Sequence, residues 1–294
     1  KYNALGTTSL AAKMMAHPNI YICFQATELL AALLGDGHSG VQDTLHELLS
    51  PGDAWTQHLF ANINNTFKRC IEQLSTHKSR KQAVQEEEVD SDSEDEEEEE
   101  EENAFEMRTV ELNPAKDAIK FAEVLTRAMT KMVAGHNTRM QKLLQHQNTT
   151  AHSVDILLEA VNLLNCLQNY VLESFLVQDP TLSNLMVTMF NFLTRMIEGP
   201  CTSNQEVLAS PQSVLIALCN RVLGYVEYNA RVNIKPAVAS LKCTLKTAML
   251  QLLVTLLEGM NNHEIVSRMV ELLDFRAMEK QVTRLYTMLG MAGE

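Results

Sequence analysis

The chain has 294 residues, enough for one large domain or a repeat array with a substantial core. Hydrophobic residues make up 46% and aromatic residues 5%, with only 11 Gly and 7 Pro, which favours helices and excludes a strand-rich protein with many turns. The net charge of −13 comes from one segment, because residues 86–102 hold 14 acidic side chains; the remainder sums to +1, which excludes a basic surface for nucleic acid.

The first predicted unit covers residues 1–77, and residues 7–77 are predicted to be helical throughout. A helix over 20–34 ends at the glycines of 35–37, and a short helix over 41–49 ends at Ser50-Pro51-Gly52. The helix after Asp53 carries apolar side chains at helical spacing: Leu59, Ile63, Phe67, Ile71 and Leu74.

Residues 78–111 interrupt this pattern with a basic patch followed by the acidic run. Like charges at this density repel and bury no apolar surface, so the segment is predicted to be a disordered insertion loop. Ser91 and Ser93 each have an acidic residue three positions on, which suggests phosphorylation by an acidophilic kinase. Mass spectrometry of the protein from cells tests this hypothesis, and two unmodified serines would reject it.

Helical signals return in the last unit, residues 112–294. Asn113-Pro114, Asp179-Pro180 and Ser210-Pro211 fit helix N-termini. The spacing of apolar residues predicts further helices after Asn113 and over 154–172, 182–196, 213–226, 237–257, 263–273 and 278–289. The fold class is therefore all-α, an irregular armadillo- or HEAT-like solenoid of about ten to eleven helices with one long acidic loop and no strict sequence repeat.

Motifs that could indicate catalysis or cofactor binding lack their structural context. Residues 35–40 read G-x-G-x-x-G but follow a helix, so they are interpreted as a helix–helix turn rather than a nucleotide site. The acidic run mimics part of an EF-hand loop, with Asp95 where glycine is needed. The sequence shows no H-E-x-x-H motif, and the methionines near residues 129–132 and 186–196 are interpreted as core. We therefore predict no enzyme activity and no cofactor.

Two short motifs resemble one known family. The first is His136-Asn137, followed by Gln141, Leu144 and Gln147-Asn148. The second and more specific one is Gly199-Pro200-Cys201-Thr202, with Asn204-Gln205 just beyond. Together with residues 26–50 and 253–259, these motifs resemble the ryanodine and inositol trisphosphate receptors, and the likeness extends over about 26–50 and 112–289.

The resemblance implies that the chain is part of an intracellular calcium-release channel. Residues 1–77 would end the preceding homology domain, and 112–294 would be the homology-associated helical domain. In that family the region is non-catalytic and links distant ligand-binding domains to the pore. It implies contacts with other domains of the same chain, a tetramer, and a place on the cytoplasmic face of the endoplasmic or sarcoplasmic reticulum, with no membrane span in this segment.

The same resemblance bears on calcium. Two family positions that supply carboxylates to the activating calcium site correspond here to Ala134 and Arg195. Alanine has no oxygen ligand in its side chain and arginine repels a divalent cation, so the metal site is expected to be lost or displaced, with Glu198 as a weak substitute. The alternative to a channel segment is a freestanding helical-repeat scaffold that binds partner peptides or helices.

Overall fold

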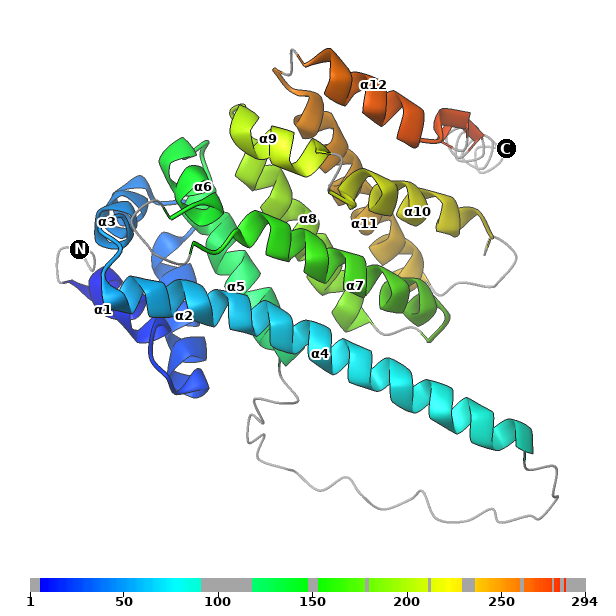
Figure 1. Cartoon of the computed structure of the whole chain (residues 1–294), viewed down its shortest axis with the longest axis horizontal. Coiled ribbons are helices and arrows are strands. Elements are labelled where there is room, and N and C mark those ends of the chain that lie inside the picture. Colours follow the sequence, from blue (N-terminus) through cyan, green and yellow to red (C-terminus); the bar gives the residue numbers. More distant parts are fainter. Residues whose placement is uncertain are drawn as a thin grey trace.

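The computed structural model describes residues 6–90, 118–147, 153–177, 180–210, 213–228, 236–259, 262–276, 278–280 and 283. Every regular element in these ranges is a helix, and the helices α1 to α12 are labelled in Figure 1. Their bounds are α1 (Thr7–Met15), α2 (Ile20–Leu34), α3 (Ser39–Leu49), α4 (Ala54–Asp90), α5 (Ala118–Val133), α6 (Thr138–Gln145), α7 (Ile156–Val177), α8 (Pro180–Ile197), α9 (Thr202–Ala209), α10 (Leu215–Tyr228), α11 (Pro236–Leu257) and α12 (His263–Leu272).

The helices form three rows that run along the molecule. The long helices α2, α5, α8 and α11 pack side by side in that order, and α1, α4, α7 and α10 form a second layer against them. The short helices α3, α6, α9 and α12 follow one another along one edge (Figure 1). The units α2–α4, α5–α7 and α8–α10 each consist of a long helix, a short helix and a second long helix, and with α11–α12 they stack as in a solenoid. The predicted all-α solenoid is confirmed.

The turn before each of the first three short helices has a constant length. Four residues join α2 to α3, four join α5 to α6 and four join α8 to α9. Each turn contains at least one glycine with positive φ, namely Gly35 and Gly37, then Gly135, then Gly199. Such glycines end a helix because they adopt the left-handed conformation without a steric penalty.

Helix α4 corrects one predicted boundary. It continues to Asp90, so it enters the segment from residue 78 that was predicted to be a loop. Residues 78–88 are mostly Lys, Arg, Gln, Ala and Glu, which have high intrinsic helix propensity and need no apolar face to extend a helix that is already formed. The rest of the predicted loop, residues 91–111, lies outside the described residues, as do Ser91 and Ser93.

One continuous apolar core runs through the stacked units. Its largest fully buried side chains include Phe60 and Phe67 of α4 and Phe190 and Phe192 of α8. The methionines interpreted as core from the sequence are all at most 1% exposed, so that interpretation is confirmed: Met129, Met132, Met186, Met189 and Met196. Flexible thioether side chains fill irregular gaps between helices of unequal length.

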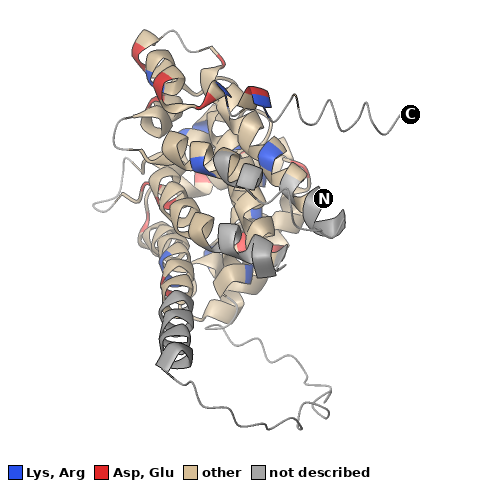
Figure 2. Cartoon of the chain, turned by 90° about the vertical axis from the view of Figure 1, so that its right-hand side faces the viewer, with Lys and Arg blue, Asp and Glu red and all other residues tan. Residues whose placement is uncertain are grey.

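Charge and thiol chemistry agree with an ordinary packed interior. Basic and acidic side chains are interspersed along the described helices (Figure 2). All six cysteines are free thiols, and burial raises the pKa of Cys70 and of Cys219 to about 12, so both stay protonated and unreactive at neutral pH.

In the described part of the chain, no helix combines the length and the apolar character that crossing a bilayer requires.

Candidate functional site

The residues singled out by the sequence motifs gather at the edge formed by the short helices. His136 and Asn137 lie in the turn between α5 and α6, and Gly199-Pro200-Cys201 forms the turn between α8 and α9. Asn204 and Gln205 follow on α9, where both are completely buried. The motifs are therefore equivalent parts of neighbouring units, and their contacts show what they do.

A buried glutamine occupies the fourth position of each of the short helices α3, α6 and α9. Gln42 of α3 donates from Nε2 to the carbonyls of Lys131 and Ala134 at the end of α5, at 2.9 Å each. These bonds join residues that are about ninety positions apart in the sequence but belong to consecutive units. The side chain is only 3% exposed, so the bonds are shielded from water.

The next two glutamines repeat this geometry. Gln141 of α6 donates to the carbonyls of Arg195 (2.7 Å) and Glu198 (2.9 Å) at the end of α8. Gln205 of α9 donates to Thr255 (3.0 Å) and Glu258 (2.8 Å) at the end of α11, with a longer contact to Leu256. The last carbonyls of a helix have no partner within the helix, so each glutamine satisfies groups that the next unit would otherwise leave unpaired.

We name these three residues, Gln42, Gln141 and Gln205, the glutamine ties. They define an internal structural repeat that the sequence analysis missed. A usable signal was present: glycine, then a short helix with glutamine as its fourth residue, occurs three times. The signal was hidden because the acidic insertion separates the first occurrence from the second.

One asparagine supports a tie directly, and a second bonds within its own unit. Asn137 accepts a hydrogen bond from the Met140 amide, which caps α6, and donates from Nδ2 to the Gln42 side-chain oxygen at 3.2 Å. Asn204 donates from Nδ2 to the carbonyl of Met196 at 2.7 Å, inside the same unit. The Asn137 side chain therefore both caps the N-terminus of α6 and holds the Gln42 tie in place.

The turns themselves stack on one another. A Cβ atom placed on Gly199 would lie 2.7 Å from His136 Cβ, and one placed on Gly259 would lie 2.7 Å from Pro200 Cγ. Gly37 approaches Ala134 in the same way. His136 also has a positive φ of 60°, unusual for a residue with a side chain. The family-like motifs thus supply the close turn-to-turn contacts between units.

Comparison with known families agrees with this geometry. Residues 116–223 match the model of the family described as RyR and IP3R Homology associated. This part of the chain is similar to the RyR and IP3R homology associated family. That region spans α5 to most of α10, and it includes the His136-Asn137 and Gly199-Pro200-Cys201 motifs. The resemblance drawn from those motifs is confirmed.

The repeated geometry extends beyond the matched residues. Gln42 lies outside the RyR and IP3R homology associated region, and so do the carbonyls of Thr255 and Glu258 that Gln205 engages. The same tie nevertheless occurs at all three junctions. The region is therefore structurally continuous with the helices on both sides of it.

The two residues that the resemblance assigns to calcium-ligand positions lie at the ends of α5 and α8. Ala134 sits in the turn after α5, and Arg195 lies in the last turn of α8. The guanidinium of Arg195 pairs with the Glu198 carboxylate at 2.7 Å, so this carboxylate already faces a cation. Across the described residues, no group of three or more His, Cys, Asp or Glu side chains has a metal-binding arrangement.

We expect Gly199→Ala to destabilise the fold more than Gly135→Ala. Both glycines have positive φ, +93° and +72°, but only the Gly199 methyl would collide with His136, because the space around Gly135 is open. Strain at each site costs about 1 kcal/mol, and the collision should add about 1–3 kcal/mol at Gly199. Urea unfolding followed by circular dichroism measures the difference; equal midpoints for the two variants would show that the turns are not in close contact.

Proposed function

We propose that this chain is a non-catalytic segment of an intracellular calcium-release channel, which couples distant ligand-binding domains to the pore. The RyR and IP3R homology associated region supports the channel assignment. The three glutamine ties support the coupling role, and they are the observation on which it depends. In this proposal the segment lies on the cytoplasmic face of the endoplasmic or sarcoplasmic reticulum and contacts other domains of a tetrameric channel.

Each unit contacts the next in two places, the apolar core and the edge formed by the short helices, and these two contacts are the physical basis of the coupling. The core packs long helix against long helix, and such close-packed interfaces transmit displacement rather than absorb it. At the edge, each tie prevents a short helix from sliding along the end of the neighbouring long helix. A rotation imposed at α1–α2 is therefore passed to α11–α12 as movement of the whole stack.

The proposed domain organisation follows the same units. Residues 1–77 would complete a preceding homology domain, 78–111 would hold the acidic insertion, and 112–294 would form the associated domain. The tie from Gln42 to Lys131 and Ala134 supports a rigid junction between the first and the last of these. A freestanding scaffold is the alternative, and the flanking gene sequence distinguishes them: a β-trefoil ligand region upstream and six apolar spans downstream would favour the channel.

We predict that Gln141→Leu weakens coupling in the full-length channel. Leucine fills a similar volume but leaves the carbonyls of Arg195 and Glu198 without their donor. Coupling energies of this kind are about 0.5–2 kcal/mol, so ligand-evoked calcium release should fall by a factor of roughly 2 to 30. Calcium flux from purified tetramers in vesicles measures this directly.

The matched control is Gln57→Leu, because Gln57 is exposed on α4 and makes a single long hydrogen bond within its own unit. Channels that carry Gln57→Leu should release calcium at the rate of the unmodified channel. Normal release from Gln141→Leu tetramers, with assembly unchanged, would contradict the coupling role.

We also propose that this chain does not bind calcium as its family does. Ala134 provides no carboxylate, and Arg195 holds a positive charge where a ligand is needed. Isothermal titration of the 294-residue chain should therefore show no calcium binding at micromolar concentration. The double variant Ala134→Glu with Arg195→Glu should bind calcium at least about tenfold more tightly, because anionic oxygens dominate calcium affinity.

The informative control is Arg195→Ala, which removes the cation without adding a ligand. Micromolar binding by the unmodified chain that persists in Arg195→Ala would mean that the chain binds calcium through other residues.

A further inference from the structure

The second junction, between the units α5–α7 and α8–α10, contains two buried side-chain oxygens without a donor. Gln141 and Asn204 are both 0% exposed. Their amide nitrogens are identified by their partners, the backbone carbonyls of Arg195, Met196 and Glu198, because a carbonyl can only accept. The side-chain oxygens, Gln141 Oε1 and Asn204 Oδ1, accept no hydrogen bond from the described residues. A buried acceptor is costly to leave unpaired, so both oxygens require a donor.

The first junction shows where this donor is needed. There Asn137, the residue before α6, donates from Nδ2 to Gln42 Oε1 at 3.2 Å. The equivalent residue before α9 is Cys201, which is 2% exposed. A thiol is a weak donor, and the Cys201 sulfur lies 3.6 Å from the hydroxyl oxygen of Ser203. The oxygen of Gln141 therefore faces a cysteine at the position where the oxygen of Gln42 receives an amide hydrogen.

Asn204 brings the second unpaired oxygen to the same place. Cys201 and Asn204 are three residues apart at the start of α9, so their side chains lie on the same face of this helix. The Asn204 nitrogen binds the carbonyl of Met196, which is next in the chain to the Arg195 carbonyl that Gln141 binds. The two amides therefore meet the same end of α8, and their oxygens belong to one polar site beside Cys201.

This buried polarity is specific to the second junction. The third residue of α3 is Val41 and the third residue of α6 is Met140, and both are buried apolar side chains. The third residue of α9 is Asn204. A polar side chain thus replaces an apolar one in the unit where cysteine replaces the asparagine before the short helix.

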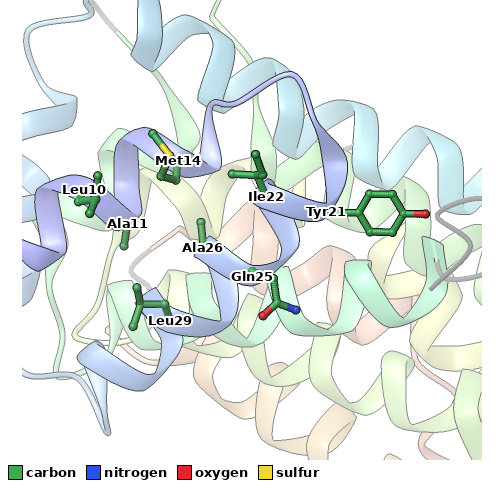
Figure 3. A pocket seen from close by; sticks show the side chains of 8 residues that line it. All are labelled: Leu10, Ala11, Met14, Tyr21, Ile22, Gln25, Ala26 and Leu29. Atoms are coloured by element: carbon green, nitrogen blue, oxygen red, sulfur yellow. The ribbon is translucent and has the colours of Figure 1, made fainter. Parts of the chain in front are cut away.

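The groove between α1 and α2 is a contrasting environment. It has a volume of about 380 Å³, and apolar side chains such as Leu10, Met14, Ile22 and Leu29 line it (Figure 3). Water in an apolar space of this kind finds too few hydrogen-bond partners to become ordered. The second junction instead presents two unpaired acceptors and a thiol in a buried site.

We propose that the second junction binds one ordered water molecule beside Cys201, which donates to Gln141 Oε1 and to Asn204 Oδ1. Water has two donor hydrogens, which match the two unpaired acceptors, and its oxygen can accept from the Cys201 thiol. Buried water typically makes about three hydrogen bonds of this kind. The water supplies to the Gln141 tie the donor that Asn137 supplies to the Gln42 tie. The proposal does not rest on the channel assignment.

A crystal structure of the unmodified 294-residue chain, at a resolution that shows ordered solvent, tests the proposal directly. It should show a water oxygen at about 2.7–3.0 Å from both Gln141 Oε1 and Asn204 Oδ1. A Cys201 thiol bonded directly to Gln141 Oε1, with no water between the two amides, would overturn the proposal. This test requires no substitution, so it does not depend on whether a variant folds.

The variant Cys201→Asn tests the energetic role of the water. An asparagine at this position should displace the water and donate to Gln141 Oε1, as Asn137 does to Gln42. The equilibrium constant for unfolding, measured in urea by circular dichroism, should then fall by a factor of about 2 to 10. In the Gln141→Leu background most of this gain should disappear, because leucine has no acceptor for the new amide.

Cys219→Asn is the matched control, since Cys219 is also buried but lies in the apolar core on α10. The same substitution there should raise the equilibrium constant for unfolding, because it places an amide among apolar side chains. An equal gain from Cys201→Asn with and without Gln141 would overturn the proposal. So would a loss of stability in Cys201→Asn as large as the loss in Cys219→Asn.

Discussion

The structure depends on a buried amide side chain that crosses from one helical unit to the end of a helix in the next. Each glutamine tie lets a helix end be buried without leaving its last carbonyls unpaired. Apolar side chains alone would allow one helix to shift along the next. A buried amide that is hydrogen-bonded to two carbonyls holds the two helices in one register. The ties therefore set the register between units, and the core fills the space that this register defines.

The three junctions are not chemically identical. At the first, Asn137 donates to the side-chain oxygen of Gln42, so both ends of that amide are engaged. At the second, Cys201 occupies the position equivalent to Asn137, and the oxygen of Gln141 accepts no hydrogen bond from the described residues. The side-chain oxygen of Gln205 likewise accepts no hydrogen bond from the described residues. The first junction thus combines more polar contacts than the others, and it is the one that joins the matched family region to the helices before it.

Local chemistry made much of the fold predictable. Glycines at helix ends and apolar side chains at helical spacing gave most helices close to their observed bounds, including the turn over residues 35–37. The ties could not be derived in this way, because the partner carbonyls of Gln42 lie about ninety residues away and carry no sequence signature. Helix α4 ran past its predicted end for a related reason: the prediction weighed apolar burial, whereas residues 78–90 have helix propensity without an apolar face.

The constant four-residue turns have a consequence for how such a chain can change in length. Every tie and every turn-to-turn contact lies at the short-helix edge, so an added residue there would shift the glutamine away from its carbonyls. The connections between successive units differ widely in length, from 2 residues between α7 and α8 to 27 between α4 and α5. A longer connection between units leaves every tie in register, so the chain can hold the acidic segment between α4 and α5 without disturbing a junction.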